Sequence, residues 1–263
     1  MLFSKVITHD TAFHADDVFA VAMLCCAGFN FQLIRTRNPL VLNDAINEPD
    51  TLVADVGGVY DPSMLNFDHH QDMSLPSAAG MIWQYFKDGI CPTDAQPFFG
   101  QFIASIDAID TNRNNIYAAW NTLPDGFRNT SNIISGFNRD VMNAAQQDKQ
   151  FDIAVDFAMT IIANERHSAI EKAKSELQYS QRAILSNNVA VFDEFSTVWK
   201  EKGEHQFAVL PHANGWQIQT RDSSVATIPE TVSECEGFIF RHGSGFMATV
   251  KEKAVAIAFA ETL

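Results

Sequence analysis

The stretch Thr51-Leu52-Val53-Ala54-Asp55-Val56-Gly57-Gly58 indicates the fold of this chain. Its nearly unbroken apolar run is typical of a strand that is buried on both faces of a parallel sheet. A carboxylate is costly to bury in such a run unless it is paired or bound to a metal ion. Asp55, at the carboxyl end of the predicted strand, is therefore a candidate site residue.

Similar runs on either side of this stretch predict the rest of one sheet. Val6–Thr8 and Phe31–Arg35 have the composition of short strands. A continuous apolar run at Val18–Ala27 and a short helix opening at Pro39 alternate with those strands. We therefore expect an α/β sheet from the start of the chain to about Asp110.

The remaining sequence predicts helices and a second, smaller domain. Ser77–Lys87 and Pro97–Ile109 carry apolar residues at helical spacing, as core-facing helices do. The segment from Phe151 to about Leu185 contains no Gly or Pro, which indicates one long helix. After it come short alternating runs separated by turn residues, and a final helix over Lys253–Thr262.

The predicted fold class is α/β: a mostly parallel, sheet-containing N-terminal domain is joined by a long helix to a smaller mixed α+β C-terminal domain. The predicted bounds are 1–150 for a metal-binding catalytic domain, 151–187 for the connecting helix and 188–263 for a small substrate-binding domain. A chain of 263 residues is long enough to bury a sizeable core.

The overall charge narrows the class of substrate. The formal net charge of −14 argues against a broad basic surface for long duplex nucleic acid. A short anionic substrate stays compatible, because carboxylates that hold divalent cations invert the local field. The four cysteines lack CxxC spacing, which predicts reduced thiols in a cytoplasmic protein; no signal peptide or membrane span is visible.

Acidic and histidine side chains gather at the ends of predicted elements. In chain order the groups are His9 with His14 and Asp16, then Asp55, then Asp68-His69-His70, then Asp107 with Asp110. Taken singly, each has an ordinary interpretation as a hydrogen-bonded histidine or a helix cap. Ligands bind at the carboxyl ends of strands in open α/β sheets, so we expect the groups at strand ends to converge. Mixed nitrogen and oxygen ligands favour Mn²⁺, with Mg²⁺, Fe²⁺ or Co²⁺ as alternatives.

These candidate ligands are more than one ion requires. Two divalent metal ions about 3.5–4 Å apart and bridged by one carboxylate form a centre for in-line attack at phosphorus. The sequence therefore predicts a two-metal phosphoesterase centre.

The order of these groups resembles the DHH phosphoesterase superfamily. Within it, the chain is similar over nearly its whole length to the melanocyte-proliferating-gene branch of metal-dependent proteins related to RNA 3′–5′ exonucleases. The most specific matching motifs are Thr8-His9-Asp10-x-x-Phe13-His14-Ala15-Asp16, Arg35-Thr36-Arg37-Asn38-Pro39, Ala54-Asp55-Val56-Gly57-Gly58-Val59-Tyr60-Asp61-Pro62 and Phe67-Asp68-His69-His70-Gln71.

The resemblance implies a metal-binding role for several residues. One ion would be held by His9, His14 and Asp55, and the other by Asp16, Asp55, His69 and an aspartate of the fourth group. Asp55 would bridge the two ions. The branch usually continues with Asn-Gly after the fourth group, where this chain has Thr111-Asn112. The fourth ligand therefore stays open between Asp107 and Asp110; we favour Asp110, because Asp-Thr also follows the sheet domain in other DHH enzymes.

The resemblance also implies catalytic and substrate-binding roles. Asp68 would orient the histidine turn, and His70 would face the scissile phosphate. Arg35 and Arg37 follow a strand and are candidates for phosphate binding, with surface ion pairing as the alternative. The glycine-rich turn Arg241-His242-Gly243-Ser244-Gly245 is a candidate substrate-binding loop, because its backbone N–H groups can approach an anion.

The predicted function is hydrolysis of phosphodiester bonds in short single-stranded RNA or oligonucleotides, with two metal ions. One alternative is a phosphodiesterase or phosphatase for a cyclic dinucleotide, a nucleotide or pyrophosphate. The other is a non-catalytic nucleotide-binding protein. The sequence leaves the oligomeric state open.

Overall fold

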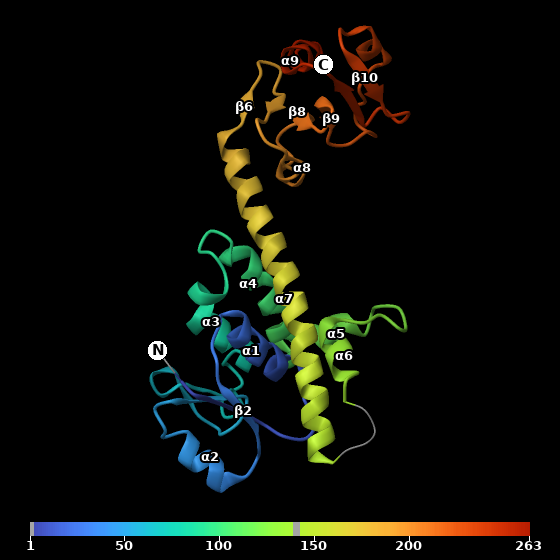
Figure 1. Cartoon of the computed structure of the whole chain (residues 1–263). Coiled ribbons are helices and arrows are strands. Elements are labelled where there is room, and N and C mark those ends of the chain that lie inside the picture. Colours follow the sequence, from blue (N-terminus) through green and yellow to red (C-terminus); the bar gives the residue numbers. More distant parts are fainter. Residues whose placement is uncertain (1–2, 139–142) are drawn as a thin grey trace. The chain divides into compact units, whose positions relative to one another are not determined.

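The computed structural model describes residues 3–138 and 143–263 (Figure 1). The chain divides into two compact units between Ile170 and Glu171, and this boundary falls inside a long helix, α7 (Ala144–Gln181). The predicted fold class is confirmed: the fold is mixed α/β, with a largely parallel sheet in the first unit and a long connecting helix. That helix begins and ends several residues earlier than the sequence predicted.

A largely parallel sheet forms the centre of the first unit. Among the described residues its order is β2-β1-β3-β5-β4, with β1 (Lys5–Thr8), β2 (Gln32–Arg35), β3 (Thr51–Ala54), β4 (Tyr60–Asp61) and β5 (Asn66–Phe67). β1 is parallel to both β2 and β3, and β3 is parallel to β5; the edge strand β4 is antiparallel to β5. The two-residue strands β4 and β5 were not predicted, because they are too short to show a period.

Helices of the first unit pack against this sheet or against one another. They are α1 (Ala15–Cys26), α2 (Pro39–Ala45), α3 (Ala78–Ile90), α4 (Gln96–Asp110), α5 (Ile116–Trp120) and α6 (Thr130–Ser135), with 3-10 turns η1 (Pro62–Met64) and η2 (Arg113–Asn115). On one face Val53 packs with Ile7 and Ala45. Leu52, which points to the opposite face, is also fully buried. β3 therefore lies in the middle of the core, as its unbroken apolar run predicted.

Three strands of this sheet end at the same edge. β1 ends one residue before His9, β3 ends before Asp55, and β5 ends before Asp68. The ladder continues past β3, because the Asp55 N–H donates to the Phe67 carbonyl oxygen at 3.0 Å. Parallel pairing therefore brings these loops together although they are far apart in sequence.

The second unit is a mixed sheet with a helix packed against it. Its order among the described residues is β10-β11-β9-β8-β7-β6, with β6 (Ala183–Ile184), β7 (Ala190–Val191), β8 (Phe207–His212), β9 (Gly215–Thr220), β10 (Phe238–Arg241) and β11 (Met247–Val250). It also contains α8 (Val198–Lys202), η3 (Glu230–Glu234) and α9 (Lys253–Ala260). Its core contains Val209, Ile218 and Ala256. The sequence predicted neither β11 nor α8.

Within the described ranges, no helix has the length and apolarity needed to cross a membrane.

Candidate metal centre

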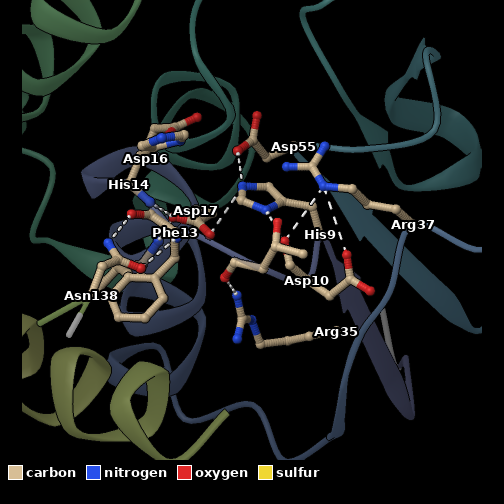
Figure 2. Close-up of polar contacts among 12 residues, drawn as sticks. His9, Asp10, Phe13, His14, Asp16, Asp17, Arg35, Arg37, Asp55 and Asn138 are labelled. Carbon is tan, nitrogen blue, oxygen red and sulfur yellow. Dashed lines mark hydrogen bonds and ion pairs between the residues drawn. The ribbon is translucent and has the colours of Figure 1, made fainter. Parts of the chain in front are cut away.

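His9 lies between two buried carboxylates. Its Nδ1 is 2.9 Å from the Asp10 carbonyl oxygen, which can only accept, so Nδ1 carries the proton. Nε2 then faces the Asp17 Oδ2 at 3.3 Å and the Asp55 Oδ2 at 3.2 Å (Figure 2). A histidine that donates one ring N–H to a backbone carbonyl and aims the other nitrogen at carboxylates has the arrangement of a metal ligand.

His69 is the centre of a second group. Its Nε2 lies 3.3 Å from Asp55 Oδ1, 3.3 Å from Asp110 Oδ2 and 3.8 Å from Asp16 Oδ2. Asp55 therefore turns one oxygen toward His9 and the other toward His69. This is the placement that a carboxylate bridging two ions would need.

The backbone at Asp55 is unusual for a residue with a side chain. Its φ of 59° lies in the left-handed region, which non-glycine residues enter at some cost. Strain of this kind is concentrated at functional sites, where the surrounding structure holds it in place. Here the β3–β5 ladder fixes the residue, and its left-handed conformation sets the direction of the carboxylate.

The carboxylates of this cluster repel one another, and their pKa values show it. Burial, followed by the charge of Asp55, raises the pKa of Asp16 well above its ordinary value. Burial also raises the pKa of Asp17 to about 7, and it raises the pKa of Asp110. Burial acts on Asp55 in the same direction, but hydrogen bonds from His69 and His9 outweigh it and hold the pKa of Asp55 below its ordinary value.

Several polar atoms of the cluster lack partners. Within the described residues, neither carboxylate oxygen of Asp16 has a hydrogen-bond donor, and neither has Oδ2 of Asp17. Buried acceptors without donors cost free energy, and a divalent cation would supply the missing partner for several of them at once. Buried Asp/His groups of this kind can bind metal ions, and these residues fit that role in number, charge and ligand type.

Asp68 and His70 form a hydrogen-bonded pair beside the cluster. Asp68 accepts from the His70 Nδ1 at 2.6 Å and from the Gly58 N–H at 2.6 Å. The bond to Asp68 outweighs burial and raises the pKa of His70. The Asp68 carboxylate thus contacts His70 rather than His69, and the His70 ring, 59% exposed, keeps Nε2 as its remaining donor.

The two aspartates of the fourth group lie in different surroundings. Asp110 is in the cluster beside His69. Asp107, three residues earlier on α4, accepts from the Ser77 N–H at 2.5 Å and lies 3.2 Å from the Arg113 Nε. Asp107 therefore supports the start of α3, and the structure does not bring it into the cluster.

The loop that carries His9, Phe13 and His14 is held in place by two residues that the sequence did not predict as part of the site. Asn138 accepts from the Phe13 N–H at 3.0 Å and donates to the Phe13 carbonyl oxygen at 2.7 Å (Figure 2). Asp17 Oδ1 accepts from the His14 N–H at 2.8 Å, as a helix-capping residue does, and this role hid its second oxygen from a sequence-based search.

His14 is less closely placed than the other predicted ligands. Its ring centroid lies 5.8 Å from that of His9, and its side chain is exposed. Among the described residues, the Asp/His groups whose potential ligand atoms lie within 4.8 Å of one another do not include it.

The two arginines predicted to bind phosphate differ in how exposed their side chains are. The Arg35 side chain is only 2% exposed; it lies over the Phe151 ring, donates to the Thr11 carbonyl oxygen and pairs with Asp148. Arg35 is thus held inside the fold, which differs from the prediction that it meets substrate. Arg37 is half exposed and lies 3.7 Å from Asp10 at the edge of the cluster (Figure 2).

The predicted substrate loop lies in the second unit, between β10 and β11. Arg241 Nε donates to the Ile228 carbonyl oxygen at 2.9 Å, and the His242 ring lies 2.9 Å from the Ser244 hydroxyl. Gly245 has a φ of 71°, and a Cβ there would lie 2.8 Å from the Thr227 Cβ, so this turn requires glycine. Gly243 has no such constraint.

Comparison with known proteins matches this arrangement to a family. Residues 5–220 match MYG1_exonuc, which is described as an uncharacterised protein family (UPF0160). The chain belongs to this family. A MYG1 protein of Chlamydia pneumoniae is 32% identical over 233 residues, which cover 81% of this chain and 73% of that protein.

Other MYG1_exonuc relatives extend the match. The MYG1 protein C694.04c of Schizosaccharomyces pombe is 27% identical and covers 92% of each chain. The MYG1 exonuclease of Rattus norvegicus is 24% identical, over 92% of this chain and 80% of that protein. Among solved structures, a pGpG-specific phosphodiesterase, PggH, from Vibrio cholerae aligns over 99% of both chains, with 13% identity and a TM-score of 0.34. A likeness at that level supports no conclusion about this chain.

Proposed function

We propose that this chain is a metal-dependent phosphodiesterase that removes nucleotides from short single-stranded RNA in the 3′–5′ direction, with two metal ions. One observation carries the proposal: Asp55 contacts two separate groups of ligand-type side chains, one around His9 and one around His69. Two adjacent sites that share a carboxylate suit displacement at phosphorus. The exonuclease name of the rat relative supports the same reaction. So does the resemblance of the motif order to DHH phosphoesterases.

We assign the two sites as follows. His9, Asp55 and His14 would hold the first ion, with Asp17 as an additional candidate, and Asp16, Asp55, His69 and Asp110 would hold the second. The mixed imidazole and carboxylate set suits Mn²⁺, with Mg²⁺, Fe²⁺ or Co²⁺ as alternatives. When bound, such ions lower the pKa of a water molecule and neutralise the phosphate oxygens in the transition state.

The protein's own residues complete the reaction. A water molecule releases a proton to solvent as its oxygen attacks phosphorus, the bond from phosphorus to the 3′ oxygen of the preceding nucleotide breaks, and that 3′ oxygen takes up a proton. His70 is placed to donate this proton from Nε2, because Asp68 holds Nδ1 and the pair raises the pKa of His70. Asp68 fixes the orientation of the ring and stabilises its charged form.

Substrate length follows from charge. A net charge of −14 disfavours long nucleic acid, which needs a basic track, so we propose that the enzyme acts on short oligonucleotides. The same charge supports a second candidate, a phosphodiesterase for cyclic dinucleotides, nucleotides or pyrophosphate. In both cases Arg37 and the Arg241–Gly245 loop are the proposed phosphate contacts, and the C-terminal region 188–263 is the proposed substrate-binding part.

The test measures cleavage of di-, penta- and longer RNA oligonucleotides, labelled at either end, by protein that has first been stripped of metal and then loaded with Mn²⁺. We expect nucleoside 5′-monophosphates to be released from the 3′ end, fastest from the shortest chains, and no release with a chelator. Cleavage of cyclic dinucleotides or pyrophosphate alone would favour the second candidate. Metal-loaded protein that binds nucleotides without turnover would contradict both and leave a non-catalytic binding protein.

A further inference from the structure

A cavity of about 230 Å³ opens beside the Asp/His cluster and has no role in the reaction as described so far. Its wall includes Asp110, which lies beside His69 in the cluster, and His14, whose ring centroid is 5.8 Å from that of His9. The rest of the wall comes from the start of α1, the end of α4, α5, α6 and the segment before α6, and it contains Tyr117, Trp120 and Asn129. The cavity therefore extends from the place where a scissile phosphate would lie.

The local chain conformation explains why the cavity exists. After α4 the backbone passes through three left-handed residues, Asn112, Asn114 and Asn115, a conformation that asparagine tolerates. This turn leads α5 away from α4, and the Tyr117 hydroxyl then donates to the Ile109 carbonyl oxygen at 2.6 Å. This bond fixes Tyr117 of α5 against the end of α4, close to Asp110.

Trp120 lies at the junction of two cavities. A second cavity of about 230 Å³ shares Trp120, Ile109 and Asn129 with the first, and its other walls include Ile106 and Ile116. The lining of the first cavity mixes polar and apolar groups about equally, whereas that of the second is largely apolar. A ligand that is polar near the phosphate and flat and apolar farther out would match this order.

The polar groups of the first cavity suit a neutral ligand. Asn129 and Asn132 use their Oδ1 atoms to bond each other's backbone N–H groups, and within the described residues their Nδ2 groups have no partner. The residues that line the cavity include no Lys or Arg. A second phosphate would need a cation there, whereas a ribose and a base need only hydrogen bonds and an aromatic face.

We propose that this cavity binds the 3′-terminal nucleoside of the substrate, with its ribose near His14 and Asp110 and its base against Trp120. This inference rests on the proposed function and names the part of the substrate that the enzyme recognises. The volume of the first cavity lies somewhat below the range of about 300–1,000 Å³ that is typical of pockets for larger ligands. It therefore suits one nucleoside rather than several. Stacking tolerates any base, so we expect little sequence preference.

The first test measures binding and does not depend on turnover. Calorimetry compares adenosine 5′-monophosphate with ribose 5-phosphate on Mn²⁺-loaded protein, so the ratio of the two affinities reports the base alone. We expect the wild type to bind the nucleotide at least about tenfold more tightly, Trp120→Phe to keep that preference, and Trp120→Ala to reduce it to about twofold or less. Phe157→Ala, which removes a partly exposed aromatic side chain outside the cavity, is the matched control and should behave as wild type.

A kinetic comparison separates this inference from the proposed function. RNA oligonucleotides that end in a normal or an abasic 3′ residue are cleaved by the same four proteins. We expect the abasic end to lower kcat/KM about tenfold in the wild type and in Trp120→Phe, and hardly at all in Trp120→Ala. If the wild type cleaves RNA but Trp120→Ala keeps the full preference for a base in both assays, the inference is wrong and the proposed function stands. If the wild type cleaves no phosphodiester, the proposed function is wrong, and the affinity ratios from calorimetry alone show whether the cavity binds the nucleoside.

Discussion

The Asp/His cluster of the first unit and the Arg241–Gly245 loop of the second differ in how their polar groups are satisfied. In the cluster, both oxygens of Asp16 are buried without a donor in the described structure. In the loop, Arg241 donates to a backbone carbonyl and His242 bonds to Ser244. Unsatisfied buried groups persist in native proteins where a ligand or ion supplies the partner. A cation could therefore supply partners for the cluster's buried acceptors, whereas these polar groups of the loop already have partners.

The largest effect is expected from the residue that joins the two halves of the cluster. Asp55→Asn removes the bridging charge and keeps the size of the side chain, and asparagine tolerates the left-handed backbone at this position. We expect kcat/KM on a dinucleotide to fall on the order of a thousandfold or more, together with the amount of Mn²⁺ bound.

Metal analysis and circular dichroism check that the Asp55→Asn protein is folded and metal-poor. Asp44→Asn is the matched control, because Asp44 is exposed on α2. Full activity in Asp55→Asn would mean that the cluster is not a shared metal centre.

A matched pair on α4 tests which carboxylates belong to the cluster. Asp110→Asn should lower kcat/KM about a hundredfold, because Asp110 lies beside His69. Asp107→Asn weakens the contacts to Ser77 and Arg113, so it should lower the melting temperature and leave the kcat of folded protein within about threefold. The reverse order of effects would assign the fourth ligand to Asp107.

Substitutions of Arg35 and Arg37 should separate effects on stability from effects on substrate binding. Arg35→Ala removes a side chain that is 2% exposed and lies over Phe151, so we expect a loss of about 2 kcal/mol in the free energy of unfolding. Urea denaturation measures it. Arg37→Ala should leave stability unchanged within about 0.5 kcal/mol. A stable Arg35→Ala protein with a raised KM would restore Arg35 as a phosphate contact.

The loop of the second unit should give a smaller effect that is confined to binding. The polar groups of the loop already have partners, so we expect the loop to contribute to substrate binding and not to the chemical step. Arg241→Ala should therefore raise the KM for a dinucleotide up to about tenfold and leave kcat within about twofold. Steady-state kinetics with Mn²⁺ distinguish the two parameters. Lys251→Ala, also in the second unit and exposed, is the control. A loss of kcat with unchanged KM would give the loop a role in chemistry instead.

The smallest expected effect is the dependence of stability on pH. The pKa of Asp17 is raised to about 7 by burial. Between about pH 4 and pH 7 the folded metal-free protein therefore keeps a proton that the unfolded chain has lost, and stability falls as pH rises through this window. A metal ion binds the ionised carboxylates, so Mn²⁺ should raise the melting temperature more at about pH 7.5 than at about pH 5.

Calorimetric melting of chelated and Mn²⁺-loaded protein at both pH values measures this difference. A metal-free melting temperature that rises from pH 5 to pH 7.5 would contradict the raised pKa values of the cluster.

Much of the fold could be predicted from local patterns. The apolar run at Thr51–Val56 predicted a doubly buried strand, and β3 is buried throughout. The spacing of Val6–Thr8, Phe31–Arg35 and the helical runs gave the alternation of a parallel sheet, because burial on two faces and helical periodicity both leave a local signal. The placement of Asp and His residues after strands indicated which loops would meet.

The tertiary structure decided what those patterns could not. It brought Asp110 into the cluster and left Asp107 outside, although both lie in the last turn of the same helix, α4. It turned one carboxylate oxygen of Asp17 toward His9, and it buried Arg35 over the Phe151 ring. It also formed the Trp120 cavity from short elements with no periodic signal. Sequence determined which residue types reach the edge of the sheet; only long-range packing determined which side chains face each other there, because that depends on neighbours from distant parts of the chain.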